Sequence, residues 1–334
     1  MHRQTQSFGY KTIRQMRNQR DRLKKSLAAG LSKGWSGFIW MLKIIVPISL
    51  MTSVLAWSGW LNKIDFILEP AMGAIDLPTV AALPLVAGLL TGPYGAIAAM
   101  APLSLTIKQM TLIAIFLLIS HNLIQEGVIQ KNSGLSFFKA TVIRLAASIA
   151  TVIIAAFFMG PETAAVAQSR AAVVLRTSFV SMLQTWVAET LILFVKILII
   201  IVVLMIILEL MKSYDLIDRV VHVMTPFLRI LGLSRQTGLL WLTAATFGLT
   251  YGAAVIVEET KAGHLSREEL EHLQISIGIN HSMIEDPVLF ISLGLSVFWM
   301  CVPRVVAAIA AVQLYIFFKR WMPLSGLSKV KHHP

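Results

Sequence analysis

The chain has 334 residues, of which 56% are hydrophobic and only 14% are charged, with a mean hydropathy of +0.74 and a formal net charge of +12. A soluble domain usually carries about 25% charged residues, and several runs here exceed the roughly 18 apolar residues that mark a membrane span. This composition excludes a water-soluble fold. The single cysteine, Cys301, excludes an internal disulfide and a cysteine-based zinc cluster.

The first segment, residues 1–33, carries nine Lys and Arg against one acid, Asp21. Such a stretch could bind nucleic acid, but basic flanks also stay on the cytoplasmic side of a first membrane span. We favour the second interpretation and expect membrane lipid, not nucleic acid, as the partner of this segment. With the basic tail at residues 321–334, it predicts a multi-pass protein of the cytoplasmic (inner) membrane with both termini cytoplasmic.

An internal repeat organises the rest of the chain. Residues 121–150 align without gaps on residues 281–310, and twelve of thirty positions are identical, including the pairs His121/His281 and Arg144/Arg304. Apolar helices can match by composition alone, but a matched histidine and arginine cannot be explained in that way. The halves are residues 34–160 and 181–320, joined by a linker at residues 161–180.

The two halves are predicted to be inverted, because equivalent segments carry opposite charge. Residues 60–78 have a net charge of −2, whereas their counterpart, residues 212–235, has +2. Lys- and Arg-rich loops stay cytoplasmic, so such a pair is expected on opposite sides of the membrane. An eight-span parallel arrangement is the alternative, and it places fewer Lys and Arg on the cytoplasmic side.

The predicted fold class is therefore an all-α polytopic membrane protein with two inverted repeats, each of about three transmembrane helices and a re-entrant hairpin. The predicted spans are 36–58, 79–100, 138–159, 186–210, 236–257 and 298–318, and the predicted hairpins are 110–130 and 270–291.

Each half contains one segment in which a histidine is followed by carboxylates, Ser120 to Glu126 and Asn280 to Asp286. Ionisable groups within a membrane are costly and usually line a cavity or pathway. Histidine and carboxylate suit two roles, the binding of a divalent cation and the relay of a proton. A purely structural role at a helix break is the alternative, and both stay open. Glu126-Gly127 and Asp286-Pro287 are the expected break points.

If the two hairpin tips meet near the midplane, these segments form one central site. Its candidate substrate- or ion-binding residues are His121, Asn122, Gln125, Glu126, His281, Ser282, Glu285 and Asp286. Four of them, His121, Glu126, His281 and Asp286, are candidate metal ligands, and a divalent cation is the one cofactor considered.

Glycine-rich breaks precede these segments, at Tyr94-Gly95 and at Tyr251-Gly252. Glycine permits close helix packing in membranes, which is the simpler interpretation. The alternative is that the breaks expose backbone groups to a ligand, with the tyrosines as pocket walls. Arg144 and Arg304 lie in apolar runs, and we expect them to extend to the lipid headgroups.

These motifs resemble the Gate, or nucleoside-recognition, domain. That domain occurs in the membrane part of ferrous iron transport protein B, in spore maturation proteins and in concentrative nucleoside transporters. The resemblance covers residues 34–320 and rests on the two-copy plan, the Gly-Pro-Tyr-Gly and Thr-Tyr-Gly breaks and the histidine-acid segments. It implies inverted repeats and a transport-like core, and it selects neither iron nor a nucleoside as substrate.

The expected function is transport of a small solute or ion across the membrane. A non-transporting scaffold in envelope or lipid assembly is the alternative, and a homo-oligomer is compatible with either. An enzyme is not expected, because the hydrolase motifs GxxxxGK[ST], HExxH and GxSxG are missing from the sequence. A water-accessible centre would favour the transporter, and a packed centre with an exposed apolar groove would favour the scaffold.

Overall fold

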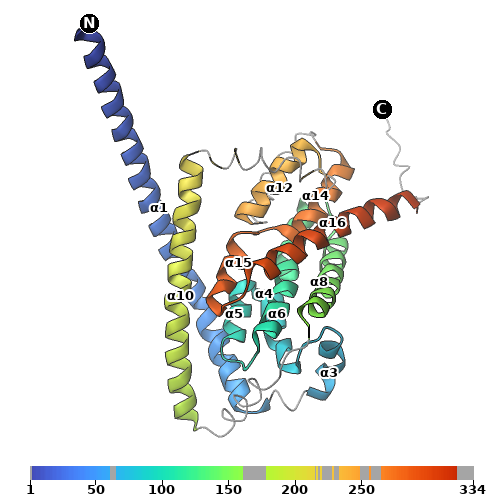
Figure 1. The fold of residues 1–334 in the computed structure, drawn as a ribbon. Coiled ribbons are helices and arrows are strands. Elements are labelled where there is room, and N and C mark those ends of the chain that lie inside the picture. The colour runs from blue at the N-terminus through green and yellow to red at the C-terminus, as the bar shows by residue number, and fades with distance from the viewer. Residues whose placement is uncertain are drawn as a thin grey trace.

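The structure is a computed structural model that describes residues 2–60, 65–160, 178–214, 216, 219, 228, 233–248, 256 and 265–321. Within these residues the regular elements are all helices and no strand occurs (Figure 1). The helices are α1 (His2–Trp57), α3 (Asp65–Gly73), η1 (Thr79–Ala81), α4 (Ala82–Thr91), α5 (Pro93–Met100), α6 (Ile107–Ser120), α7 (Leu123–Asn132), α8 (Phe137–Met159), α10 (Phe179–Ser213), α12 (Arg235–Phe247), α14 (Arg267–Asn280), α15 (Glu285–Phe290), η2 (Ile291–Leu293) and α16 (Val297–Trp321).

Five helical stretches of the described chain are long and apolar enough to cross a membrane. Large apolar side chains on their outer faces are exposed, such as Phe157 at 82%, Ile192 at 59% and Val306 at 60%. A soluble protein rarely exposes so much contiguous apolar surface. The prediction of an all-helical, multi-pass membrane protein is therefore confirmed. The five stretches are Gln19–Trp57, Ile107–Asn132, Phe137–Met159, Phe179–Ser213 and Val297–Trp321.

Helices α1 and α10 lie side by side and run antiparallel (Figure 1). Ser26 near the start of the α1 span contacts Ser213 at the end of α10, whereas Ser49 farther along α1 accepts a hydrogen bond from Trp186 near the start of α10. A Cβ atom on Gly30 would lie 2.6 Å from the α10 backbone. Small residues let membrane helices pack this closely, where lipid provides no hydrophobic driving force between them.

The predicted span at residues 79–100 is wrong, because the chain turns back at Gly92. Gly92 has φ +82° and ψ −169°, a conformation that favours glycine, and Pro93 begins the next helix. Helices α4 and α5 are only 10 and 8 residues long, and they pack against each other, with Gly88 close to Ala96. A membrane span needs about 20 residues, so neither helix crosses alone.

The predicted hairpins at residues 110–130 and 270–291 are also folded differently. Their breaks exist, after α6 at His121 and after α14 at His281. However, α7 packs against α8 and α4 rather than folding back on α6, and α15 packs against α10, α16, α5 and α6. Each half therefore has a broken helix in place of a hairpin. Of the predicted span 236–257, residues 236–247 lie in α12 (Arg235–Phe247), and most of the rest lies outside the described residues.

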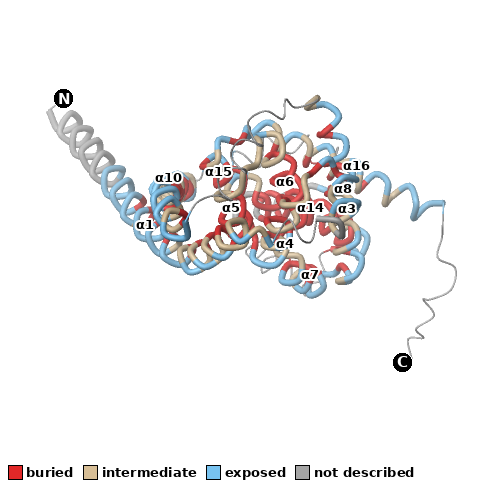
Figure 2. Tube along the Cα trace, turned by 90° about the horizontal axis from the view of Figure 1, so that it is seen from below, coloured by how far each residue is buried: buried red, intermediate tan, exposed pale blue. Residues whose placement is uncertain are grey.

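Helices α6 and α14 form the centre of the molecule. Every residue from Thr111 to Ser120 and from Leu270 to Asn280 is buried. Figure 2 shows the two helices within the buried core, surrounded by helices whose outer faces are exposed. A helix buried on all sides is typical of the interior of a membrane bundle. Whatever lies at the ends of α6 and α14 is thereby held in the protein interior.

Candidate functional site

Helices α6 and α14 begin with the same capping motif. The hydroxyl of Thr106 or Ser266 accepts a hydrogen bond from the third helical residue, whose side chain accepts one from the cap N–H in return. At α14 that residue is Glu269, and hydrogen bonds from the backbone and hydroxyl of Ser266 hold its pKa below the usual value. Both helices are 14 residues long, so the same capping motif at their N-termini places their C-termini at equivalent positions.

The two helices also end alike, at His121 and His281. Each histidine has extended backbone, with ψ of 162° and 161°. The next residues, Asn122 and Ser282, are left-handed, with φ of 47° and 49°. A non-glycine residue in this region is uncommon, and such residues cluster at functional sites and switch regions. The chain therefore breaks in the same unusual way twice, 160 residues apart.

The backbone groups that these breaks release are bonded within the protein. The N–H of Asn122 donates to the Gly88 carbonyl of α4, and the N–H of Ser282 donates to the Ala244 carbonyl of α12, both at 3.2 Å. A Cβ on Gly92 would lie 2.8 Å from the Asn122 amide, so glycine is also needed there for space. Non-helical backbone at membrane depth is tolerated only where protein or water satisfies it.

Arg144 and Arg304 lie in the interior, at 1% and 0% exposed, so the expectation that they reach the headgroups is wrong. The Arg144 guanidinium donates to the carbonyls of Ile119 and His121, both at 2.8 Å. Arg304 donates to the two equivalent carbonyls of α14, at 2.8–3.2 Å. The last carbonyls of a helix have no partner within it, and a buried cation there satisfies them.

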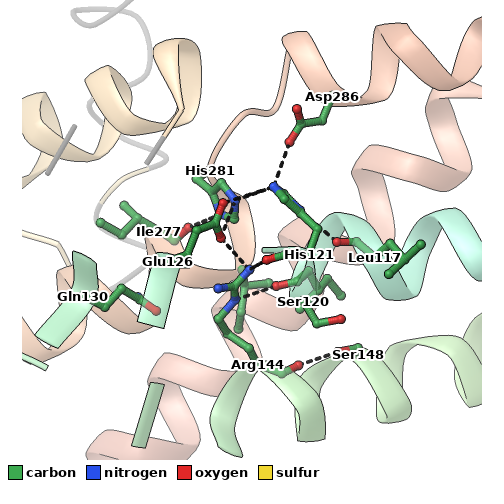
Figure 3. A network of polar contacts seen from close by, with 12 residues as sticks. Leu117, Ser120, His121, Glu126, Gln130, Arg144, Ser148, Ile277, His281 and Asp286 are labelled. Carbon is green, nitrogen blue, oxygen red and sulfur yellow. Dashed lines mark hydrogen bonds and ion pairs between the residues drawn. The ribbon is translucent and has the colours of Figure 1, made fainter. Parts of the chain in front are cut away.

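The two histidine rings meet at the centre (Figure 3). Their Nε2 atoms are 3.2 Å apart and their ring centroids 4.8 Å apart. Each Nδ1 lies 2.9 Å from a carbonyl oxygen one turn earlier, Leu117 for His121 and Ile277 for His281. A carbonyl can only accept, so Nδ1 carries the proton in both rings, and both Nε2 atoms point toward the centre.

Both carboxylates lie against the histidine of the other half. Oε2 of Glu126 is 3.2 Å from Nε2 of His281, and Oδ2 of Asp286 is 3.4 Å from Nε2 of His121. Oε1 of Glu126 is also 3.2 Å from His121, and Oε2 is 2.7 Å from the Arg144 guanidinium. Glu126 and Asp286 are only 6% and 7% exposed. The four candidate metal ligands thus form one closed cluster, which we call the His–carboxylate centre.

Two details of the predicted breaks are wrong. Helix α7 begins at Leu123 and continues through Glu126 and Gly127, and α15 begins at Glu285 with Ile284 as its cap, so Asp286 is not the N-cap. The breaks lie earlier, at the histidines. There the arginines bind the free carbonyls, and the left-handed residues redirect the chain.

The other predicted site residues lie around the centre or away from it. The Tyr94 hydroxyl donates to Glu285 at 3.3 Å, which joins α5 to α15 beside the centre. Gly95 is buried against α4 and α1, so its role is packing. Gln125 is exposed on α7 and is therefore not part of the buried cluster. Tyr251 and Gly252 lie outside the described residues.

A buried pair of glutamines escaped the sequence analysis. Gln130 donates through Nε2 to the Gln274 carbonyl at 2.7 Å, and Gln274 donates to the Ser133 carbonyl at 3.1 Å. The pair ties α7 to α14, one from each half. A signal was present, since Gln130 is four residues after Glu126 and Gln274 is seven before His281, which places each on the helix face of a site residue.

The long apolar helices and the polar cluster that they enclose define a multi-pass helical membrane protein with a buried His–carboxylate centre. The chain is a distant homologue of the uncharacterized membrane protein YvoD of Bacillus subtilis (strain 168). The two are 28% identical over 304 residues, which cover 90% of this chain and 97% of YvoD. No family model matches the chain, and no solved structure matches it.

Proposed function

We propose that this protein is a cytoplasmic-membrane transporter for a small solute or ion, and that the His–carboxylate centre is its binding site. The observation that carries the proposal is the meeting of His121 and His281, whose Nε2 atoms are 3.2 Å apart although 160 residues separate them in the chain. Buried ionisable groups within a membrane are expensive and mark ion or substrate pathways. Transporters typically bind their substrates at broken helices between two repeats.

The antiparallel packing of α1 and α10 supports an inverted relationship between the halves. Each is the first long helix of its half, and Lys43 of α1 aligns with Lys196 of α10. Two equivalent helices that run in opposite directions across the membrane are what an inverted repeat requires. A parallel repeat would place them in the same direction.

The contacts at the two ends of α8 support the same relationship. At its C-terminal end, Lys108 at the start of α6 donates to the Gly160 carbonyl at 2.8 Å. At its N-terminal end, Lys139 lies 3.8 Å from Glu271 at the start of α14. Helix α8 has 23 residues, which at about 1.5 Å per residue spans about 34 Å. The equivalent helices α6 and α14 thus begin on opposite sides of the bundle and converge on the centre.

The basic residues at two helix ends support an orientation in which both termini are cytoplasmic. In the view of Figure 1, the α1 helix begins at the upper left and the α16 helix ends at the upper right, so both ends lie toward the top of the view. Both ends are basic, with Lys24 and Lys25 in α1 and Lys319 and Arg320 in α16. Basic flanks stay cytoplasmic, so this side is the cytoplasmic one. The resemblance to the Gate domain agrees with this arrangement and belongs to the proposal.

The His–carboxylate centre is closed, with its four residues at 1–7% exposed. A closed centre is also what the scaffold alternative requires. The two functions differ in whether the centre opens: a transporter must expose it to each side in turn, whereas a scaffold keeps it packed.

Accessibility of the centre tests the proposal. In a Cys301→Ser background, Asn122→Cys places a thiol at the break beside His121, and Ala114→Cys places one in the fully buried part of α6. In oriented vesicles, a membrane-impermeant thiol reagent is expected to modify Asn122→Cys from either side and to leave Ala114→Cys unmodified. If Asn122→Cys reacts from neither side, the transport function is wrong and the scaffold function is the one supported.

A further inference from the structure

When both histidines are neutral, the side-chain atoms of His121, His281, Glu126 and Asp286 that face one another are all hydrogen-bond acceptors. The Arg144 guanidinium is a donor beside them, 2.7 Å from Oε2 of Glu126. Nδ1 of each histidine donates to a carbonyl, so Nε2 of a neutral ring offers a lone pair. The atoms that face these two nitrogens are the oxygens of Glu126 and Asp286. Oδ2 of Asp286 is buried and has no hydrogen-bond partner within the described chain. Acceptors repel one another at such distances unless a positive charge lies between them.

The distances between the acceptor atoms indicate whether the positive charge between them is a proton or a metal ion. Charge-assisted N–H···O bonds are about 2.7–2.9 Å long, and the Arg144–Glu126 pair, at 2.7 Å, has that length. The contacts around His121 Nε2 are longer, at 3.2 Å to His281, 3.2 Å to Glu126 and 3.4 Å to Asp286. A single proton on this nitrogen could point at only one of them.

A tetrahedral metal site has the spacing observed around His121 Nε2. Donors at about 2.0–2.1 Å from a zinc ion are about 3.3–3.4 Å from one another. With Oε1 of Glu126 as its donor, the three separations from His121 Nε2, to His281, Glu126 and Asp286, are 3.2–3.4 Å. The donors of His121, His281 and Asp286 all lie within 4.8 Å of each other. A rotation of the Asp286 carboxylate can shorten the longest of these separations.

The surroundings hold the donors as a metal site requires. Metal-binding histidines usually donate their other N–H to a carbonyl or carboxylate, which fixes the ring and the tautomer. Leu117 and Ile277 provide those carbonyls. Arg144 in turn holds the Glu126 carboxylate in place.

We propose that the His–carboxylate centre binds one four-coordinate divalent transition-metal ion through His121, His281, Glu126 and Asp286. The inference rests on the proposed function in taking this ion as the cargo or coupling ion of the transporter. Imidazole with carboxylate suits Zn²⁺ and its neighbours in the first transition row. Mg²⁺ and Ca²⁺ prefer sites built from oxygen alone, and no thiolate is present in the centre for Cu⁺.

The test uses the full-length purified protein, stripped with a chelator and titrated with Co²⁺ as a spectroscopic probe. We expect one Co²⁺ per chain, the intense visible absorption of tetrahedral Co²⁺, and its loss when Zn²⁺ is added. X-ray absorption of the Zn²⁺ form should show two imidazole and two oxygen ligands at about 2.0–2.1 Å. Failure of the folded wild-type protein to bind, or an octahedral Co²⁺ spectrum, overturns the proposal.

Two variants make the test specific. His121→Ala is expected to weaken Co²⁺ binding at least about 100-fold, since it removes a ligand directly rather than a supporting contact worth 10–100-fold. His272→Ala is the matched control, because His272 is also buried but lies in the first turns of α14, away from the centre. Equal binding in wild type and His121→Ala contradicts the proposal. Because His121→Ala could lose the fold, Glu126→Gln, which keeps the shape of the ligand, should show the same loss.

The outcomes separate this inference from the proposed function. If the protein binds metal but shows no flux in vesicles, the proposed transport function is wrong and the proposed metal site still holds. If the protein transports a solute but binds no metal, the proposed metal site is wrong and the proposed transport function still holds.

Discussion

Arg144 and Arg304 make the same hydrogen bonds at equivalent places in the two halves. Arg144 donates to the carbonyl of His121, and Arg304 donates to the carbonyl of His281, both at 2.8 Å. Each arginine thereby joins the last long helix of its half, α8 or α16, to the break that holds the histidine. Only Arg144 also contacts a carboxylate within 4 Å among the described residues, so the two halves share this structural contact but differ in charge pairing.

Removal of Arg304 is therefore expected to destabilise the protein. Arg304→Met leaves the carbonyls of Ile279 and His281 buried without a donor, and each such group costs about 1–3 kcal/mol. The midpoint of thermal unfolding in detergent should fall clearly. Arg304→Lys should recover only part of it, since an ammonium lacks the planar fork of guanidinium. Arg320→Met, at an exposed position of α16, is the control. Equal midpoints for the two methionine variants would contradict the structural role.

The sequence alone could match the positions of these two arginines, but it could not predict their hydrogen-bond partners. The His–carboxylate segments were found because polar residues recur at a fixed shift of 160, a pattern that apolar composition does not produce. The same alignment matched Arg144 with Arg304, yet their role depends on which backbone carbonyls lack partners. Those carbonyls become visible only when the helix ends at His121 and His281 are known.

The other differences between the predicted and the observed structure depend on how the helices pack against one another. Residues 79–100 are apolar enough for a span, and only the conformation of Gly92 and the contact of α4 with α5 show that they fold back. Gln130 and Gln274 align with Phe290 and Ala114, so the repeat carried no signal for them. Their contact joins the two halves and arises only in the assembled bundle.

The close contact of α1 with α10 gives a second prediction. In Gly30→Ala, the new Cβ would lie 2.6 Å from the Cα atom of Ile206, and the backbones must move apart. Overpacking of this kind typically costs about 1–3 kcal/mol. Gly37→Ala on the same helix meets nothing within 4 Å. It should be neutral or stabilising by up to about 1 kcal/mol, because alanine favours helix. Thermal unfolding of both variants measures the difference, and equal effects would show that the helices do not pack here.

The proposed inverted arrangement predicts that two equivalent helix starts lie on opposite sides of the membrane. Asp76 contacts Lys108 at the start of α6, and Glu268 lies in the first turn of α14; both side chains are 59% exposed. In a Cys301→Ser background, an impermeant thiol reagent applied to intact cells should modify Asp76→Cys. It should modify Glu268→Cys only after permeabilisation. Labelling of both from one side would rule out the inverted model and restore the parallel one.

The last prediction concerns coupling between the two carboxylates. Glu126 and Asp286 belong to different halves but lie 3.2 and 3.4 Å from the same atom, His121 Nε2. Groups that share a partner typically couple by about 0.5–3 kcal/mol, whereas distant groups add within about 0.5 kcal/mol. Glu126→Gln and Asp286→Asn should therefore be non-additive in a double-mutant cycle on Co²⁺ affinity or transport.

A matched control for that cycle pairs Glu126→Gln with Glu268→Gln, whose carboxylate lies at the far end of α14. These two changes should add. The unequal distances to His121 and the single arginine contact also predict that Glu126→Gln has the larger effect of the two centre variants, because it frees Arg144 as well as removing a ligand. Strict additivity between Glu126→Gln and Asp286→Asn would show that the carboxylates act separately. The matched helix ends would then be a shared architecture without a shared binding site.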